Sequence, residues 1–191
     1  MNGVEAAKRR LRSEFRAKVA MLPSEVSEQS DRAIQNRVLS LPEFLVADSI
    51  FCYVGVQGEI ATTTLIDVAL SARKRVAVPM VGANRLMEAR VIADLHSLRK
   101  GAFGLLEPDA SMPVLHPCEI DLSLVPCVSC DRMGNRLGQG GGYYDRYLSM
   151  CQSLAVALCR DVLISAELPT EEHDVPMDIV VTESALYRRI V

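Results

Sequence analysis

The sequence predicts a single α/β domain, a three-layer αβα sandwich with a mostly parallel sheet. Its 191 residues have room for one ordinary domain. Several short segments are apolar throughout, which is typical of strands covered on both faces. Segments with helical periodicity separate them, an alternation typical of parallel sheets. We find no internal repeat or linker, so we expect residues 1–191 to form one domain.

The N-terminal part of the chain predicts three helices and one strand. Residues 4–22 repeat apolar side chains with a period near 3.6, which predicts a helix. Ser24 is a suitable cap for a second helix that extends to about Leu41. The apolar run 49–55 predicts a strand that ends in glycine, and a third helix is predicted from Thr62 onward.

The rest of the chain predicts strands, one long loop and one more helix. The stretch 94–119 contains several glycines and prolines, so we expect mostly loop. A helix is predicted from Gly141 to Cys151. The predicted strands are 75–80, 86–92, 121–130, 154–159 and 178–183.

Composition and charge exclude several classes of protein. Hydrophobic residues make up 49% and charged residues 24%, the balance of a globular protein with a core. No apolar run reaches the roughly 18 residues of a membrane span, and the N-terminal residues carry charges where a secretory signal is apolar. The net charge of −3 does not favour a nucleic-acid or membrane partner. We therefore expect a cytoplasmic protein that acts on small molecules as a monomer.

The first 20 residues are locally basic, with six basic against two acidic side chains and a net charge of +4. Lys8 and Arg12 are four positions apart, so they share one face of the predicted helix. That face is either a solvated stripe or a site for an anionic ligand. A docking arm for a nucleic acid is a further alternative, although no aromatic residues are interleaved to strengthen it.

The six cysteines lie in a chain without an export signal, so we expect reduced and mostly buried thiols. Pro126 to Cys130 has the P-C-x-x-C spacing of zinc deaminases, and Cys118 offers another ligand upstream. The companion H-x-E or C-x-E motif is absent from the sequence. Cys127 and Cys130 also lie three apart in a predicted strand, where we expect their sulfurs to diverge. This favours thiols over a metal site.

The most informative segment is the glycine-rich turn within Asp131 to Leu148, DRMGNRLGQGGGYYDRYL. It follows a predicted strand and opens a predicted helix, which is where parallel sheets bind ligands. Glycines let backbone N–H groups approach a phosphate, and the helix N-terminus adds partial positive charge. Arg136 offers a forked donor to the same group. A tight structural turn is the alternative.

The residues after this turn have alternative roles. Tyr144, with Leu148 and Cys151, is expected on the core side of the helix, which leaves Tyr143 to face the loop and stack on a planar ligand. Asp145 lies in the first helical turn, where the helix dipole favours a carboxylate without any function. Beside a phosphate site, a carboxylate is also how Mg²⁺ is held.

The segment RLGQGGGYYDR resembles the signature of the 5-formyltetrahydrofolate cyclo-ligase family, also called 5,10-methenyltetrahydrofolate synthetases. The N-terminal KRRLR, GEI at Gly58, GLLEP at Gly104 and LPTEEHDVPMDIVVTE at 168–183 resemble the family in the same order, so the resemblance covers nearly the whole chain. It implies an αβα sandwich. It also implies an ATP- and Mg²⁺-dependent closure of 5-formyltetrahydrofolate to 5,10-methenyltetrahydrofolate, with release of ADP and phosphate.

The resemblance also implies roles for individual residues, with Arg136 and Tyr143 as the catalytic pair. ATP contacts are implied for Lys8, Arg9, Arg10, Leu11, Arg12, Arg136, Leu137, Gly138, Gln139, Gly140, Gly141, Gly142, Tyr143 and Tyr144. Folate contacts are implied for Val54, Glu59, Phe103, Gln139, Gly140, Gly141, Gly142 and Tyr143, and Mg²⁺ contacts for Asp145 and Asp174. Taken alone, Glu59 is a loop carboxylate and Asp174 a turn residue. Gln139 departs from the family, since some relatives carry a basic residue there.

Overall fold

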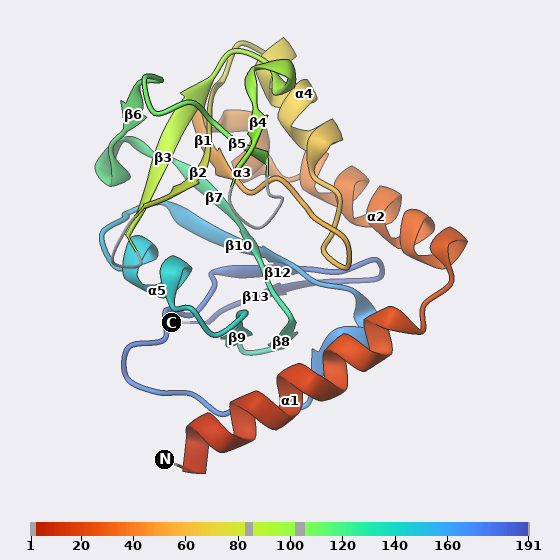
Figure 1. Ribbon diagram of the computed structural model, residues 1–191. Helices are drawn as coiled ribbons and strands as arrows, with labels where there is room; N and C mark the ends of the chain where they lie inside the picture. The colour runs from red at the N-terminus through yellow and green to blue at the C-terminus, as the bar shows by residue number, and fades with distance from the viewer. Residues whose placement is uncertain (1–2, 83–85, 102–105, 191) are drawn as a thin grey trace.

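The protein is described by a computed structural model that covers residues 3–82, 86–101 and 106–190. Its centre is an eight-stranded sheet in the order β13-β12-β10-β7-β1-β2-β3-β6 (Figure 1). The strands from β12 to β2 pair in parallel, whereas β13, β3 and β6 pair antiparallel to their neighbours. The prediction of a mostly parallel sheet is confirmed.

The elements follow the predicted order. The helices are α1 (Gly3–Ala20), α2 (Ser24–Leu39), α3 (Pro42–Val46), α4 (Thr63–Ser71) and α5 (Tyr143–Leu148), with 3₁₀ turns at η2 (Leu95–Ser97), η4 (Pro117–Glu119) and η5 (Asp161–Leu163). The strands of the large sheet are β1 (Ser49–Cys52), β2 (Arg75–Val81), β3 (Met87–Ile92), β6 (Val114–Leu115), β7 (Leu122–Pro126), β10 (Leu154–Leu158), β12 (Ile179–Val181) and β13 (Leu186–Arg188). The short strands are β4 (Arg99–Lys100), β5 (Leu106–Glu107), β8 (Ser129–Asp131), β9 (Arg136–Leu137) and β11 (Ile164–Ser165).

Helices cover both faces of the sheet because alternate strand residues point to opposite sides. Ile50 of β1 belongs to a core cluster with residues of α2, α3 and α4. Phe51, the next residue, belongs to a second cluster with Tyr147 of α5. Phe15 of α1 packs with residues of β7, β10 and β12 on that same second side. The predicted three-layer sandwich is therefore present.

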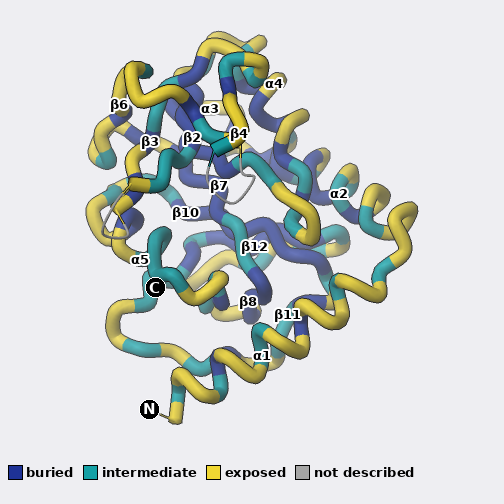
Figure 2. The backbone as a smooth tube through the Cα atoms, viewed as in Figure 1, coloured by how far each residue is buried: buried dark blue, intermediate teal, exposed yellow. Residues whose placement is uncertain are grey.

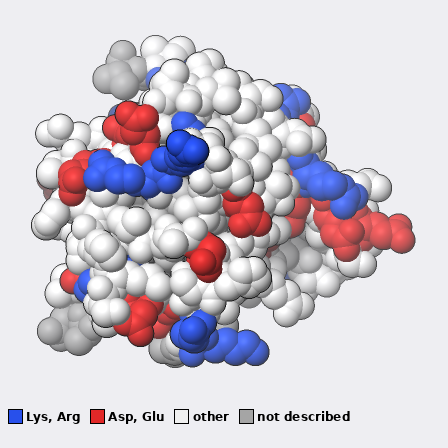
Figure 3. All heavy atoms as spheres, turned by 90° about the horizontal axis from the view of Figure 1, so that it is seen from above, with Lys and Arg blue, Asp and Glu red and all other residues white. Residues whose placement is uncertain are grey.

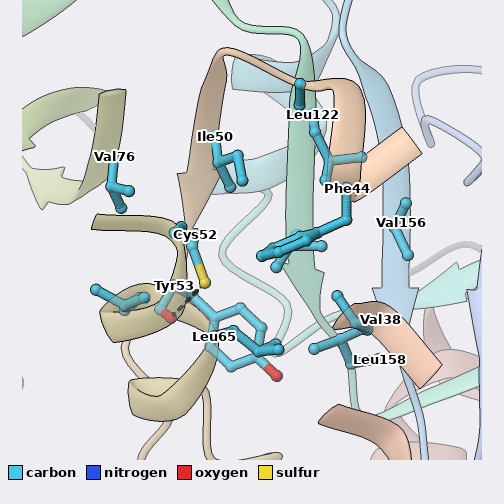
Figure 4. Packing of buried hydrophobic residues seen from close by; sticks show 14 of the residues in the cluster. Val38, Phe44, Ile50, Cys52, Tyr53, Leu65, Val76, Leu122, Val156 and Leu158 are labelled. Carbon is cyan, nitrogen blue, oxygen red and sulfur yellow. Dashed lines mark hydrogen bonds between the residues drawn. The ribbon is translucent and has the colours of Figure 1, made fainter. Parts of the chain in front are cut away.

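The larger cluster lies between the sheet and the helices α2 to α4. Figure 4 shows Val38 and Phe44 from the helices reaching toward Leu122 and Leu158 from the strands. All four side chains are buried. Figure 2 shows the same division along the chain, with the central strands mostly dark and the outward sides of α1 and α2 exposed. The strands that contribute to this core come from the segments that are apolar throughout in the sequence.

One predicted strand is broken, and the break corrects an expectation about two cysteines. Residues 121–130 form β7 and β8, separated by a bend at Cys127 and Val128. The alternation of a strand does not continue through a bend. The sulfurs of Cys127 and Cys130 do not diverge but lie within 4.8 Å of each other. The prediction that they point apart is wrong.

The loop and helix boundaries also differ from the predictions. The stretch 94–119 holds η2, β4, β5, β6 and η4 in addition to loops, and α3 and β13 were not predicted. Helix α5 is shorter than predicted, and its fully packed aromatic side chain is Tyr147 rather than Tyr144. Among the described residues, no helix has both the length and the apolar character to cross a membrane.

Candidate active site

A cavity of about 480 Å³ opens at the carboxyl ends of β1, β2 and β7, the edge of a parallel sheet where ligands bind. Helix α1, the glycine-rich loop 137–142 with the start of α5, and the loop 171–174 complete its walls. Its size falls within the roughly 300–1,000 Å³ typical of small-molecule sites. Segments far apart in the sequence therefore meet in one space.

Helix α1 turns one polar face toward this cavity. Glu5, Lys8 and Arg12 line it, as their spacing of three and four residues predicts. Lys8 is only 6% exposed, which is rare for lysine and requires paired charges. Its Nζ lies 3.0 Å from Glu171 Oε2 and 2.5 Å from Asp174 Oδ2. At Lys8 and Arg12, the predicted basic face of the helix therefore lies toward the cavity.

The glycine-rich loop lies directly against this face of α1. Nε of Arg12 donates a hydrogen bond of 2.8 Å to the carbonyl oxygen of Gly138. Gly140 has a φ of +98°, and a Cβ there would lie 3.2 Å from Cζ of Arg12. Glycine is therefore required at 140 for both its backbone angle and the close approach of the guanidinium. Burial, followed by the neighbouring Arg16, lowers the pKa of Arg12.

A cation stands beside Gln139, the residue that departs from the family pattern. Nη2 of Arg16 donates a 2.6 Å hydrogen bond to Oε1 of Gln139. Arg16 lies one helical turn beyond Arg12 on α1. The loop therefore has a guanidinium close to position 139, supplied by the neighbouring helix.

Arg136 is held in place at the start of the loop by fixed partners. Its side chain is 3% exposed, and Nη2 donates to Oδ1 of Asp145 at 2.8 Å. Nη1 donates to the carbonyl oxygen of Pro126 at 3.3 Å, and the guanidinium lies 5.7 Å from the ring centre of Tyr144. Nε is buried without a hydrogen-bond partner among the described residues. Asp145 and Pro126 therefore fix the guanidinium at the cavity wall.

Asp145 and Asp174 line the same cavity but have different neighbours. Oδ1 of Asp145 accepts from Arg136 and from the backbone N–H of Val175. Asp174 groups with Glu171 and His173, whose potential ligand atoms lie within 4.8 Å of one another. Carboxylate oxygens are the donors that Mg²⁺ prefers, and Mg²⁺ sites usually combine one or two carboxylates with phosphate oxygens. The chemistry of these residues therefore fits a magnesium ion beside a phosphate loop.

The opposite side of the cavity contains Glu59, Val54 and Tyr53, which follow β1. Oε2 of Glu59 accepts from the backbone N–H of Val56 at 3.3 Å. Burial raises the pKa of Glu59 above its ordinary value. No ion pair joins Glu59 to a cation among the described residues. Partial desolvation of such a carboxylate costs free energy, which a ligand that donates hydrogen bonds would recover.

Arg160 fixes the backbone on which Glu59 stands. It is buried, and its guanidinium donates to the carbonyl oxygens of Gly58 at 3.2 Å and Glu59 at 3.3 Å. The same guanidinium pairs with Asp31 of α2 at 2.5 Å. Burial raises the pKa of Asp31, and the charge of Arg160 opposes that rise. The loop after β1 is therefore attached to the helical layer.

Both tyrosines at the start of α5 line the cavity. The expectation that Tyr143 faces the loop is confirmed, and the guanidinium of Arg146 lies 5.6 Å from its ring centre. Tyr144 is not confined to the core as expected, since it borders the cavity and also packs on three core clusters. Because α5 begins at Tyr143, both rings lie in its first turn, at the edge of the cavity.

Some predicted site residues lie elsewhere. Arg9 and Arg10 are exposed on α1 and do not line the cavity, and Leu11 packs on the core beneath the helix. Phe103 lies outside the described residues. The other predicted positions line the cavity: Val54, Glu59, Lys8, Arg12, Arg136, Leu137, Gly138, Gln139, Gly140, Gly141, Gly142, Tyr143, Tyr144, Asp145 and Asp174.

Several residues of the cavity were not predicted as site residues. Glu171 and His173 stand beside Asp174 in the motif LPTEEHDV, so their proximity in sequence was a usable signal. Tyr53, Pro79 and Cys127 stand at or just past the ends of parallel strands. Their common signal is that position, because the carboxyl ends of parallel strands meet at one edge.

The basic N-terminal segment does not form one continuous exposed arm, because Lys8 and Arg12 face the cavity. Lys18 pairs with Glu14 on the helix surface at 2.9 Å. These contacts of Lys8, Arg12 and Lys18 favour a small anionic ligand over a docking arm for nucleic acid. Figure 3 views the molecule from above, away from α1, and on the described part of that face basic and acidic side chains lie among uncharged surface.

Comparison with known proteins agrees with the resemblance noted in the sequence. A profile described as the 5-formyltetrahydrofolate cyclo-ligase family matches residues 4–183. The chain is 32% identical to a 5-formyltetrahydrofolate cyclo-ligase of Haemophilus influenzae, with 91% of this chain and 97% of the relative aligned. It is 30% identical to the protein of that name from Escherichia coli K12, over 88% and 95% of the two chains.

Solved structures show the same relationship. The NMR structure of 5,10-methenyltetrahydrofolate synthetase from Aquifex aeolicus matches with a TM-score of 0.85 and 30% identity, covering 95% of this chain and 92% of that one. A 5,10-methenyltetrahydrofolate synthetase from Mycoplasma pneumoniae matches with a TM-score of 0.75 at 20% identity, which supports the fold alone. The cavity residues lie within the matched range, and the chain belongs to the 5-formyltetrahydrofolate cyclo-ligase family.

Proposed function

We propose that this chain closes 5-formyltetrahydrofolate to 5,10-methenyltetrahydrofolate at the expense of ATP, with release of ADP and phosphate. The formyl oxygen of an amide is a poor leaving group, so it is first phosphorylated by the γ-phosphate. N10 then attacks the formyl carbon and loses its proton, and the C–O bond breaks with departure of phosphate. Such a reaction needs positioning and charge neutralisation rather than a covalent nucleophile.

One observation carries the proposal: a single cavity contains both the glycine-rich loop with its neighbouring cations and the half-buried carboxylate Glu59. Direct transfer of a phosphoryl group requires the two substrates to be in contact. Lys8 and Arg12 lie on the loop side and suit the phosphates of ATP. Glu59 suits the amino and N3–H donors of the pterin. The arrangement supports phosphate transfer within one space.

We assign Arg136 and Tyr143 to the reacting groups. Arg136 lines the cavity and is fixed by Asp145 and Pro126, which suits stabilisation of charge on the phosphoryl oxygens. Tyr143 borders the cavity beside the glycine loop, which suits stacking on the planar pterin. Gln139 and the glycines from 140 to 142 lie between the two substrate regions and serve both.

The carboxylates suit Mg²⁺ as the partner of ATP. Asp145 and Asp174, with Glu171 beside Asp174, would hold it. When bound, Mg²⁺ neutralises charge on the phosphate oxygens and orients them. Lys8 and Arg136 already balance these carboxylates, so the protein's own ion pairs keep the acidic groups in position.

We infer that the chain acts as a monomer, because the cavity is complete within one chain. Light scattering coupled to gel filtration tests this inference, and a stable dimer would contradict it. The cytoplasmic location stays a prediction.

The proposed reaction is tested by mixing the purified protein with 5-formyltetrahydrofolate, ATP and Mg²⁺ while recording the absorbance of the methenyl product. We expect product to form only with all components present, with one ADP and one phosphate released per ring closed. ADP formation without the chromophore, or ring closure without ATP consumption, would contradict the mechanism. The variant Arg136→Met serves as a control for contaminating activity and should be nearly inactive.

A further inference from the structure

Three cysteines from different segments converge at the side of the cavity. Cys127 follows β7, Cys130 lies in β8, and Cys159 directly follows β10. Their sulfur atoms all lie within 4.8 Å of one another. Cys130 and Cys159 are buried, whereas Cys127 is partly exposed and lines the cavity. We call these three residues the thiol cluster. One of its members is open to small molecules and two are not.

The break in the predicted strand 121–130 creates this arrangement. Pro126 ends β7, and the bend at Cys127 and Val128 turns the Cys127 sulfur back toward Cys130. The Cys127 thiol donates a hydrogen bond of 3.2 Å to the carbonyl oxygen of Leu158, the residue that precedes Cys159. Cys127 and Cys159 directly follow Pro126 and Leu158, which pair across the parallel strands β7 and β10, so their backbones are as close as neighbouring strands. A disulfide needs such an approach of the backbones.

Two buried guanidinium groups stand beside Cys127. Arg136 shares the wall of the large cavity with it, and Arg160 lines a small neighbouring void with Cys127 and Cys159. This void measures about 10 Å³, roughly the space for one water-sized atom. Cations favour the thiolate over the thiol, and the thiolate is the reactive form. The void gives room for one oxygen atom on sulfur.

The acid–base behaviour of the cluster agrees with this geometry. Hydrogen bonds from Cys130 and Cys159 lower the pKa of Cys127 well below its ordinary value, and Arg136 and Arg160 act in the same direction. Burial raises the pKa of Cys130. The hydrogen bond with Cys127 raises the pKa of Cys159. These effects favour ionisation of Cys127 over ionisation of Cys130 or Cys159.

Two further titratable groups, Glu59 and Tyr53, border Cys127 in both cavities. Burial raises the pKa of each of them. A charge on Cys127 also raises the pKa of Glu59, so an ionised Glu59 opposes the thiolate that the two arginines favour. A zinc site would instead need three deprotonated thiolates, and the adjacent arginines oppose a metal cation. The surroundings favour a single reactive anion over a metal centre.

We propose that Cys127 is an oxidation site for hydroperoxides, and that Cys130 or Cys159 captures the oxidised sulfur as a disulfide. This inference does not depend on the folate reaction. The oxidation would take place at Cys127, on the part of the cavity wall beside Glu59, when no substrate is bound.

The proposed reaction has two balanced steps. The Cys127 thiolate attacks one oxygen of the hydroperoxide, the O–O bond breaks, and the alkoxide or hydroxide that leaves takes up a proton. Cys127 is oxidised to a sulfenic acid and the peroxide is reduced to an alcohol or water. The second cysteine, which loses its proton, then attacks the sulfenic sulfur. The S–O bond breaks, water leaves, and a disulfide remains that an external thiol reduces.

The first test measures alkylation of the ligand-free wild-type protein by iodoacetamide near pH 6. Cys118 is the internal reference, because it is exposed and lies outside the thiol cluster. We expect Cys127 to be modified about tenfold faster than Cys118, despite its lower exposure. A rate at or below that of Cys118 would overturn the proposal. Cleavage before Asp121 places Cys118 and Cys127 in separate fragments, and tandem mass spectra distinguish Cys127 from Cys130.

The second test treats the wild-type protein with hydrogen peroxide and maps disulfides after tryptic digestion. Cys118, Cys127 and Cys130 share the fragment 101–132, whereas Cys151 and Cys159 share the fragment 147–160. A 127–159 bond joins the two fragments, and a 127–130 bond removes two hydrogens from the first. Tandem mass spectra then assign the bonded sulfurs within each fragment. Either result supports the proposal. Oxidation that leaves the cluster reduced would refute it.

Variants and metal binding complete the test. Cys127→Ser should abolish the cluster disulfide, whereas Cys118→Ser, the matched variant of an exposed thiol, should leave it unchanged. The wild-type measurements stand on their own if a cluster variant fails to fold. The protein is also incubated with Zn²⁺ alone and its metal content measured. One tightly bound equivalent that is lost in Cys127→Ser would overturn oxidation in favour of a metal site.

Discussion

At the scale of single residues, each cation of the cavity is already held by the protein. Lys8 contacts Glu171 and Asp174, and Arg136 contacts Asp145. Arg12 is attached to a carbonyl oxygen of the glycine loop. Groups held in this way lose little further conformational entropy when a ligand arrives. Removal of one of these cationic side chains therefore breaks a specific contact in the cavity, rather than only lowering its overall positive charge.

Arg12→Ala tests the assignment of the loop side to ATP. The change removes the guanidinium that lies over Gly140 without emptying the hydrophobic core. A charge-assisted hydrogen bond is worth about 1.5–3 kcal/mol, so we expect the KM for ATP to rise about tenfold or more. The KM for folate should change less than twofold. Steady-state kinetics with each substrate varied in turn measure both values.

Arg10→Ala is the matched control, since Arg10 is exposed on the same helix and does not line the cavity. Its KM for ATP should stay within twofold of the wild-type value. An Arg12→Ala enzyme with an unchanged KM for ATP would remove Arg12 from the nucleotide site.

Glu59→Gln tests the desolvated carboxylate. Because burial raises the pKa of Glu59, its charged form weakens the folded state at neutral pH. The neutral amide should therefore raise the melting temperature at pH 7, by about 2–4 °C per kcal/mol gained. Protonation of Glu59 removes the penalty, so this gain should shrink as the pH falls through the raised pKa toward the ordinary value. Calorimetry between pH 4 and about 8 measures the difference.

The same variant should bind folate poorly, because the amide replaces one acceptor by a donor. We expect the KM for folate to rise about tenfold or more while the KM for ATP changes little. Glu167→Gln, at an exposed position, should alter neither the melting temperature nor either KM. A Glu59→Gln enzyme with normal folate kinetics would exclude the carboxylate from pterin binding.

At the scale of elements, the turn between β8 and β9 is organised by one buried carboxylate. Asp131 accepts hydrogen bonds from the backbone N–H groups of Met133, Asn135 and Leu168, at 2.9 to 3.1 Å. It also accepts from the side chain of Asn135 at 2.8 Å. These contacts fix the entry to the glycine loop and join it to the segment before Glu171. The loop's geometry therefore depends on a residue outside the cavity.

Asp131→Ala should destabilise the protein by about 2–4 kcal/mol, because several buried donors lose their acceptor together. Asp94→Ala provides the comparison, since Asp94 caps the exposed η2 turn through one backbone donor, Ser97. That variant should cost about 1 kcal/mol. Urea unfolding at matched pH measures both changes. Equal losses in the two variants would show that burial of Asp131 adds nothing.

The elements also show what the sequence could and could not predict. Apolar strands and periodic helices are local patterns, and α1, α2 and β10 were placed within about two residues. The bend at Cys127 was missed, because a short apolar run has no periodicity that reveals a break. Tyr144 was assigned to the core for a similar reason: periodicity places a residue on a helix face but does not say where a cavity adjoins it. Those two positions depend on tertiary packing.

At the scale of the whole molecule, the site follows from the topology of the sheet. The parallel strands β1, β2 and β7 all end at the edge where the cavity opens, so each contributes the residues that follow it. The glycine-rich turn could be recognised from its amino-acid sequence alone. Its contact with α1 could not be predicted from the local sequence, because Arg12 and Gly138 are 126 residues apart in the chain. Only the family resemblance connected such distant segments before the fold was known.

A single shared cavity predicts that the two substrates bind cooperatively. The glycine loop from Gly138 to Gly142 borders both regions, so the first ligand orders backbone that the second also uses. We expect 5-formyltetrahydrofolate to tighten binding of an ATP analogue with a non-transferable γ-phosphate by about fivefold. Linkage requires the analogue to tighten folate binding by the same factor. Titration calorimetry with Mg²⁺, in both orders of addition, measures the two factors.

Arg12→Ala serves as the control for this measurement. The variant should bind the ATP analogue more weakly, whereas its affinity for folate in the absence of the analogue should be unchanged. Independent affinities would mean that the ligands occupy separate clefts, and direct phosphate transfer would then be excluded.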